Sequence, residues 1–411
     1  MGSDGYHPFF YKKFWDTINL DLTSFIRNIY EDKAIPASIN KTLIAIIPKI
    51  SEPTSISQFR PISPCNTVYK IVTKIIANRL RGFLPSRISP NQNSFLPGRG
   101  IKTNVIVVNE VLHSMKKRKG KKDLPSIELI MTCVSSVTSS VLVNGIPTEN
   151  FNPSRGIRQD RKTWSPFGMG SKQVPISHLF ADDILLFGET SLENILSLKD
   201  TFDTFCAFSS QTISVLKSRV LFSRNTSQND RNLFCDATSF RETDDLSPYL
   251  GFPISSSRPS KNRVKLICDK ILKKLDSWKA AILSKVGRSC LVSATLNTLP
   301  NYYMQCMLMP CSLLNSLNSS LAKFLWGKGE NSRGLHLVGW DHIARPKESG
   351  GLGIRCFKAL NKAHLLKLWW RTSNQEGNLA VQVLKDKYSK PNNQFRAFSA
   401  GSHLWNSMGK V

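Results

Sequence analysis

Two adjacent aspartates, Asp182 and Asp183, interrupt an apolar stretch that extends over residues 176–187. Neighbouring side chains of a β-strand point to opposite faces, and two buried like charges are costly unless a cation or hydrogen bonds offset them. The pair therefore predicts a tight turn between two strands, at which both carboxylates reach one metal ion. The dipeptide is not diagnostic by itself, because adjacent aspartates are common.

The chain is strongly basic, with 56 Lys and Arg against 29 Asp and Glu and a net charge of +27 over 411 residues. Such a charge favours binding to phosphates, so nucleic acid is the first partner to consider. A basic protein of the ribosome or of chromatin, or one that binds anionic membranes, is the alternative on charge alone. The hydrophobic fraction of 41% excludes a disordered tail.

Neither a membrane span nor a secretory leader is visible, because no apolar run approaches ~20 residues and the first residues lack the secretory pattern. We therefore expect an intracellular protein, nuclear or cytoplasmic, without a membrane partner. Nine scattered cysteines form no CxxC pair, which supports neither a disulfide framework nor a zinc finger. For the closest candidates, Cys306 and Cys311, core packing is favoured over metal binding.

Apolar residues at helical spacing predict helices over residues 16–33, 66–83 and 101–115. A β-branched run at 42–47, which ends at Pro48, predicts a strand that leads into a loop. The basic run at 116–122 is interpreted as a solvated loop, with direct phosphate contact as the alternative.

Further strands are predicted at 133–143, at 179–187 and at 249–254, with a helix at 192–208. The Asn144–Gly145 pair predicts a two-residue hairpin turn. Beyond Pro259 a basic amphipathic helix is predicted from the apolar face of Val264, Ile267, Cys268, Ile271 and Leu275. The predicted core of the C-terminal helical region consists of Leu365, Leu368, Trp369 and Trp370.

The segment FADD at 180–183 resembles the YXDD-type box of reverse transcriptases, in the form found in plant LINE-like, non-LTR retrotransposons. Other blocks resemble the same family in the same order along the chain. They are GSDGYHPFFYKKFW at 2–15, INKTLIAIIPKISEPTSISQFRPI at 39–62, NQNSFLPGRG at 91–100, SRGIRQ at 154–159, YLGFPI at 249–254, KVGRSCLVSATLNTLPNYY at 285–303, FLWG at 324–327 and PKESGGLGI at 346–354.

The resemblance implies an α+β fold, a right-hand polymerase with fingers, palm and thumb, an incomplete antiparallel palm sheet and a helical C-terminal region. The expected domains are the fingers and start of the palm at 1–122, a truncated palm with the FADD box at 123–258, a helical thumb at 259–330 and a truncated connection region at 331–411.

The implied activity is RNA-directed DNA synthesis with two Mg²⁺ (or Mn²⁺) ions, which activate the primer 3′ hydroxyl and stabilise the leaving pyrophosphate. The implied partners are an RNA template, a DNA primer and deoxynucleoside triphosphates; no oligomeric state is implied. By this resemblance Asp182 is the principal catalytic metal ligand and Asp183 its neighbour.

Further site residues follow from the same resemblance. Lys49 and Arg60 would hold the incoming triphosphate, although exposed solubilising charges are an alternative. Gln159 would border the nucleotide and the template, and Lys217 resembles the palm lysine that follows the metal strand. Support of the primer end is implied for Tyr249, Leu250 and Gly251, where glycine permits close approach; core packing is the alternative for these residues.

The chain departs from the family at two places. The family carries its first catalytic aspartate in a segment like DLEKAYDR, but here residues 123–126 leave no room for that strand and helix, and Asp123 precedes Pro125 too closely to replace it. After Gln159 the expected GDPLSP motif and its helix are replaced by an interval punctuated by Pro166, Gly168, Gly170 and Pro175.

We therefore expect a defective polymerase, from a decayed element or from a gene model spliced across the lesions. No endonuclease, Cys/His or RNase H region is recognisable, which indicates a fragment of a polyprotein. The alternatives are a non-catalytic nucleic-acid-binding relic, a pseudogene product that fails to fold because its sheet has unpaired edges, or a basic scaffold of unrelated fold.

Overall fold

The structure is a computed structural model that divides into two compact units, residues 1–89 with 136–154 and residues 90–135 with 155–411. It describes the whole chain except residues 1–3, 41–43, 63, 89–90, 118–124, 131–141, 144–145, 148–167, 170–171, 174–176, 181–182, 210–212, 256–259, 277–282, 297–299, 327–337, 375–377, 391 and 393.

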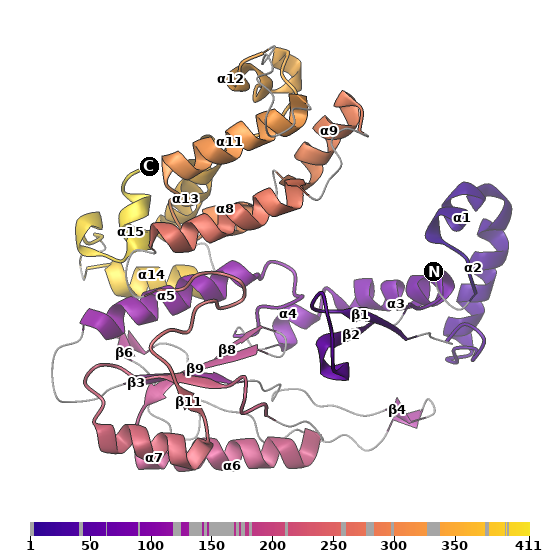
Figure 1. Ribbon diagram of the computed structural model, residues 1–411. Coiled ribbons are helices and arrows are strands. Elements are labelled where there is room, and N and C mark those ends of the chain that lie inside the picture. Colours follow the sequence, from indigo (N-terminus) through magenta and orange to yellow (C-terminus); the bar gives the residue numbers. More distant parts are fainter. Residues whose placement is uncertain are drawn as a thin grey trace. The chain divides into compact units, whose positions relative to one another are not determined.

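The first unit combines helices with a β-hairpin (Figure 1). Its elements are α1 (Pro8–Lys13), α2 (Trp15–Glu31), β1 (Ala45–Pro48), η1 (Ile56–Gln58), β2 (Phe59–Ile62), α3 (Thr67–Leu80), α4 (Leu84–Arg87), β4 (Leu142–Val143) and β5 (Ile146–Pro147). Strands β1 and β2 pair antiparallel, as do β4 and β5. The Tyr30 hydroxyl donates a hydrogen bond to the Val72 carbonyl at 3.0 Å, which joins α2 to α3. The helices predicted at 16–33 and 66–83 are confirmed.

The second unit contains a five-stranded sheet in the order β11-β10-β3-β9-β8. These strands are β11 (Arg241–Glu242), β10 (Arg219–Leu221), β3 (Pro125–Ile130), β9 (Asp183–Glu189) and β8 (Ser177–Phe180). All neighbours pair antiparallel except β10 and β11. Two further short strands, β6 (Gly168–Met169) and β7 (Lys172–Gln173), pair with each other.

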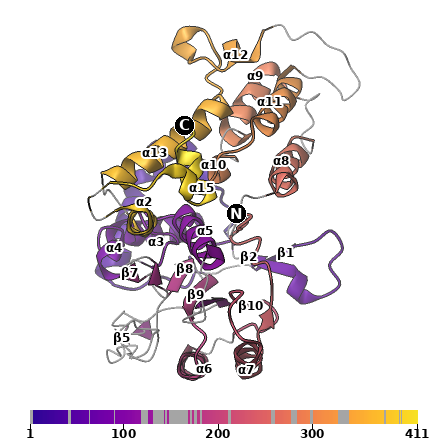
Figure 2. The same ribbon diagram turned by 90° about the vertical axis from the view of Figure 1, so that its left-hand side faces the viewer.

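Helices cover both faces of this sheet, α6 (Leu192–Ser209) and α7 (Gln228–Thr238) on one face and α5 (Ile101–Lys117) on the other (Figures 1 and 2). Side chains of β9 alternate between the two layers, as a strand buried on both faces requires. Ile184 and Leu186 pack in the cluster of α6 and α7, whereas Leu185 and Phe187 pack in the cluster that contains α5. The helices predicted at 101–115 and 192–208 are confirmed.

The position of β3 corrects the expectation that residues 123–126 leave no room for a strand. Pro125–Ile130 pairs with β9 on one side and with β10 on the other, so it is the central strand of the sheet. The sequence offers β-formers at Ile127, Leu129 and Ile130, and proline is tolerated as the first residue of a strand. The strand predicted at 133–143 lies outside the described residues except for β4, and the Asn144–Gly145 turn and residues 118–122 of the basic run lie outside them as well.

Residues 249–254 form a tight turn rather than the predicted strand. Tyr249 and Phe252 exchange two backbone hydrogen bonds of 3.0 and 2.8 Å. Leu250 and Gly251 between them have φ angles of 49° and 78°, and a turn with two positive φ angles reverses the chain in two residues. The prediction is wrong because an apolar run of this length does not distinguish a strand from a turn whose side chains are buried.

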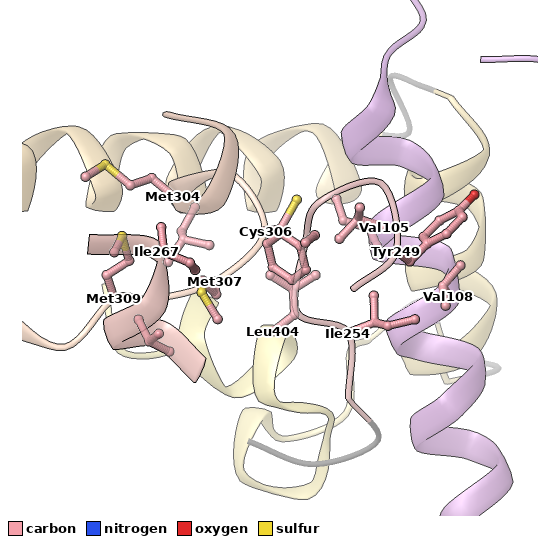
Figure 3. Close-up of a cluster of buried hydrophobic side chains, with 14 of the residues drawn as sticks. Val105, Val108, Tyr249, Ile254, Ile267, Met304, Cys306, Met307, Met309 and Leu404 are labelled. Carbon is pink, nitrogen blue, oxygen red and sulfur yellow. The ribbon is translucent and has the colours of Figure 1, made fainter. Parts of the chain in front are cut away.

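The C-terminal part, over its described residues, contains helices joined by loops and no named strand. Its elements are α8 (Lys261–Asp276), α9 (Lys285–Leu291), η3 (Val292–Leu296), α10 (Asn301–Met304), α11 (Cys311–Trp326), α12 (Trp340–Ile343), η4 (Lys347–Ser349), α13 (Phe357–Ser373), α14 (Leu379–Tyr388), η5 (Phe398–Ala400) and α15 (His403–Met408). These helices share one buried core with α5 and with the turn at Tyr249 (Figure 3). The amphipathic helix predicted beyond Pro259 is confirmed as α8.

Two core predictions in this part need correction. Trp370 is 63% exposed, because it lies on the outer face of α13, whereas Leu365 is fully buried. Cys306 is buried, and burial raises the pKa of its thiol to about 12, but Cys311 is exposed at the start of α11. None of the helices in the described ranges is long and apolar enough to span a bilayer.

Candidate functional site

The two aspartates lie at the connection between β8 and β9. Phe180 and Asp183 form the last pair of the β8–β9 hairpin, which agrees with the predicted position of a tight turn between two strands. Asp183 is half-buried and precedes four strongly buried residues, Ile184 to Phe187. Asp182 lies outside the described residues. The hairpin therefore places Asp183 at the end of the sheet, where a carboxylate can retain partial contact with solvent.

The C-terminal end of β3 lies at the same end of the sheet as Asp183. Ile130 pairs with Ile184, the residue directly after Asp183. The residues that follow Ile130 in the sequence are Met131, Thr132 and Cys133, and none of them has a carboxylate. The acid within β3 is Glu128, which pairs with Leu186 farther from the turn.

Lys217 belongs to the same end of the sheet. Arg219, two residues later, pairs with Leu129 of β3, and Leu129 pairs with Leu185 of β9. Lys217 precedes β10 in a turn in which its backbone N–H donates to the Ser214 carbonyl at 3.0 Å. Its exposed side chain starts near the level of Asp183 across the sheet.

Tyr249 lies close to Asp183 and is held by two asparagines that sequence reasoning missed. The Tyr249 hydroxyl accepts a hydrogen bond of 3.3 Å from Asn104 Nδ2, and Asn104 Oδ1 accepts one from Asn93 Nδ2. Burial raises the pKa of Tyr249 well above its usual value; the hydrogen bond from Asn104 opposes this shift and the charge of Asp183 adds to it. The block at 91–100 contains Asn93, but a polar residue in a loop gives no signal of this partner.

Two tyrosines from the end of the block at 285–303 fix the turn at Tyr249. The Tyr302 hydroxyl donates to the Leu250 carbonyl at 3.0 Å, and the Tyr303 hydroxyl donates to the Gly251 carbonyl at 3.3 Å. Both rings pack against Phe252, with centroid distances of 5.9 and 5.8 Å. Tyr249 is 2% exposed, so its ring is core. Gly251 is exposed, so a ligand can approach the turn closely at this residue.

Lys49 and Arg60 belong to the first unit, on the β1–β2 hairpin. Arg60 pairs with Ile47, and the Lys49 backbone N–H donates to the Gln58 carbonyl at 2.7 Å. The side chains of both residues are exposed. The hairpin therefore brings the two cations onto one element, and their assignment to phosphate binding stays a prediction. Gln159 lies outside the described residues.

The acids of this site do not fit the two-ion centre that the resemblance implies. Two adjacent carboxylates can bind one hard cation, and Asp183 is suitably placed for this role. Over the described residues, no three His, Cys, Asp or Glu side chains gather closely enough to hold a metal ion. A two-ion centre also needs an acid from a second strand, and the sequence from Leu129 to Cys133 contains none.

Comparison with known proteins gives two informative similarities, whereas no protein-family model matches the chain. The chain is 34% identical over 136 residues to a protein of Arabidopsis thaliana named as a ribonuclease H protein, a match that covers 33% of this chain and 22% of that protein. It is 24% identical over 424 aligned positions to the uncharacterized 149 kDa protein of transposon TX1 from Xenopus laevis.

The second match covers 89% of this chain but 31% of the transposon protein. The chain therefore spans less than a third of the length of either relative. Together these similarities indicate that the chain derives from a transposable element.

Proposed function

We propose that the chain derives from the reverse transcriptase of a plant-type non-LTR retrotransposon and binds nucleic acid without polymerising DNA. The ordered sequence blocks and the similarity to a transposon protein over 89% of the chain support this descent. So does a hairpin with paired aspartates beside a central strand, because a polymerase palm needs carboxylates at such a sheet end. The net charge of +27 supports phosphate binding.

The loss of polymerisation rests on one observation, the chemistry at the end of β3. This strand ends beside Asp183, where the family requires a further aspartate, and its next residues are Met131, Thr132 and Cys133. A sulfur, a hydroxyl and a thiol do not replace a carboxylate as a ligand for a hard cation. The chain therefore lacks a metal ligand for the ancestral reaction, whereas the strand itself is present.

The residues at the site keep binding roles in this proposal. Asp182 and Asp183 would hold Mg²⁺ or Mn²⁺, which supplies charge neutralisation for phosphate oxygens. The turn at Tyr249 would support a primer end at the exposed Gly251. Lys49, Arg60, Gln159 and Lys217 would contact the triphosphate or template, and the bound strands would be an RNA template and a DNA primer.

Primer extension tests the proposal. The purified full chain is incubated with an RNA template, a DNA primer, deoxynucleoside triphosphates and Mg²⁺, beside a double variant with Asp182→Ala and Asp183→Ala. We expect no extension by either protein, together with primer-template binding whose affinity falls steeply with salt. An active reverse transcriptase in the same assay controls for the reagents.

Three outcomes would contradict the proposal, each in favour of a different alternative. Extension by the unchanged chain that is lost in the double variant would mean that another acid completes the metal site. Extension by both proteins would overturn the assignment of Asp182 and Asp183. A chain that aggregates and shows no cooperative unfolding in urea would support the pseudogene product instead. Restoring the two lost segments should rescue extension if their absence is the defect.

A further inference from the structure

A basic pocket lies on the second unit, between the C-terminal half of α5 and the helices α11, α13 and α15. Its volume is about 980 Å³. Figure 2 shows α13 and α15 together above α5. Among the described residues, its lining contains five lysines and two histidines but no acid. These basic residues are Lys116, Lys117, Lys358, Lys362, Lys410, His113 and His403.

The floor of this pocket is apolar and fixed. Leu308, Met309 and Pro310 form part of it. The buried Asn361 side chain accepts a hydrogen bond of 2.8 Å from the Met309 N–H and donates to the carbonyls of Met304 and Met307 at 2.8 and 2.9 Å. The segment from Leu308 to Pro310 is therefore held in place before any ligand binds.

The charge around the pocket is uncompensated in the described part of the chain. Lys117 Nζ donates to the Ala400 carbonyl at 2.8 Å and has a structural role. The other four lysines are exposed, and none of them forms an ion pair with an acid among the described residues. Lys358 and Lys362 lie four residues apart on α13, where like charges repel each other.

His113 also lines this pocket. Its pKa is lowered to about 4, first by burial and then by Lys387, Lys117 and Lys116, with Glu110 opposing the shift. Its Nδ1 is buried and has no hydrogen-bond partner among the described residues.

We propose that this pocket is a second nucleic-acid site, which binds a short single-stranded stretch with its bases against the apolar floor and its phosphates on Lys116, Lys358 and Lys362. Ammonium groups bind phosphate oxygens as point charges. An apolar floor can pack against the face of any base, whatever the nucleotide sequence. The pocket volume suits a few nucleotides of one strand rather than a duplex.

This site is distinct from the turn at Asp183. Helix α5 carries Asn104 of the first site and Lys117 of the second, and thirteen residues of helix correspond to about 20 Å. The inference rests on the nucleic-acid binding proposed above, but its test can fail separately.

The test compares two triple variants of the full chain in binding to a labelled single-stranded RNA, followed by fluorescence anisotropy. The pocket variant carries Lys116→Gln, Lys358→Gln and Lys362→Gln. The control variant carries Lys199→Gln, Lys285→Gln and Lys347→Gln, which remove the same charge from exposed positions outside the pocket. All six changes are on the surface, and thermal unfolding of each variant verifies that the fold is kept.

We expect the pocket variant to bind RNA at least about tenfold more weakly, and its slope of log affinity against log salt to fall by about 2, since each phosphate contact with a single strand contributes about 0.7. The control variant should change affinity less than about threefold. Equal losses in both variants would overturn the proposal, and so would failure of the unchanged chain to bind RNA, which would also overturn the proposed function.

A second measurement locates the RNA without mutation. Cys311 lines the pocket and is exposed, whereas Cys290 is exposed on α9 outside it. Bound RNA should slow maleimide modification of Cys311 at least about fivefold and leave Cys290 unchanged, as read by mass spectrometry of the peptides. Inorganic triphosphate in place of RNA distinguishes the phosphate source: protection by triphosphate alone would assign the pocket to a free polyphosphate and overturn the nucleic-acid proposal.

Discussion

Helix α5 contributes to two buried polar networks, which differ in chemistry. Near its start, Asn104 joins Asn93 to the Tyr249 hydroxyl with neutral hydrogen bonds. One to two turns later, Glu110 is fully buried, and its carboxylate accepts hydrogen bonds of 2.7 Å from both Lys387 Nζ and the Tyr388 hydroxyl. It also accepts one from the Ser402 hydroxyl.

The difference predicts how strongly each network contributes to the stability of the second unit. A buried charge is tolerated only when its partners satisfy it, and loss of one partner is strongly destabilising. The Glu110 network therefore makes the attachment of α14 and α15 to α5 all-or-none. Neutral hydrogen bonds contribute less each, so the loss of one hydrogen bond at the Tyr249 turn should destabilise the chain less than the loss of Glu110.

The largest effect is expected from Glu110→Ala. This change leaves the Lys387 ammonium buried without its counter-ion, and we expect the free energy of unfolding in urea to fall by about 3–5 kcal/mol. Burial lowers the pKa of Lys387, while Glu110 raises it. Without Glu110 the lysine loses its proton more readily, so the deficit should shrink as the pH rises towards 10.

Glu242→Ala is the matched control. Glu242 pairs with Arg231 at 2.6 Å, but the two side chains are 35% and 21% exposed. Removal of such a pair costs about 0–1 kcal/mol. Equal losses for Glu110→Ala and Glu242→Ala would contradict the all-or-none attachment.

A smaller effect is expected from Tyr249→Phe. The substitution removes the acceptor of a buried hydrogen bond from the Asn104 amide, which costs about 1–2 kcal/mol. Tyr303→Phe is the control, because the hydroxyl of this residue makes its 3.3 Å bond at the surface. A urea midpoint shifted as far by Tyr303→Phe as by Tyr249→Phe would mean that the buried network does not hold the turn.

The sequence predicted elements whose signal is local and missed those that depend on distant partners. The sequence pattern predicted α2, α3, α5, α6 and α8, and the paired aspartates predicted the hairpin turn. The role of β3 was missed because its place is set by pairing with β9 and β10, which lie far along the chain. Likewise, 145 residues separate Asn104 from Tyr249, and 277 separate Glu110 from Lys387. No window of sequence contains both partners.

The smallest effect concerns the pH dependence of stability at His113, beside the Glu110 network. Its pKa in the folded chain is about 4, below the usual 6.5. Between these values the unfolded chain binds a proton and the folded chain does not, so the stabilisation present above pH 6.5 is lost as the pH falls towards 4. Since the side chain is partly exposed, we expect wild type to lose only about 1 kcal/mol more than His113→Gln between pH 7 and 4.5.

Salt separates the two causes of this shift. Urea unfolding of both proteins at each pH is repeated in 1 M salt, where the screening length is about 3 Å. If burial dominates, as the order of causes at His113 indicates, most of the difference between wild type and His113→Gln persists. If the difference disappears, the charges of Lys387, Lys117 and Lys116 set the pKa of His113, and a polyanion bound in the basic pocket should then raise this pKa and reduce the pH dependence, as salt does.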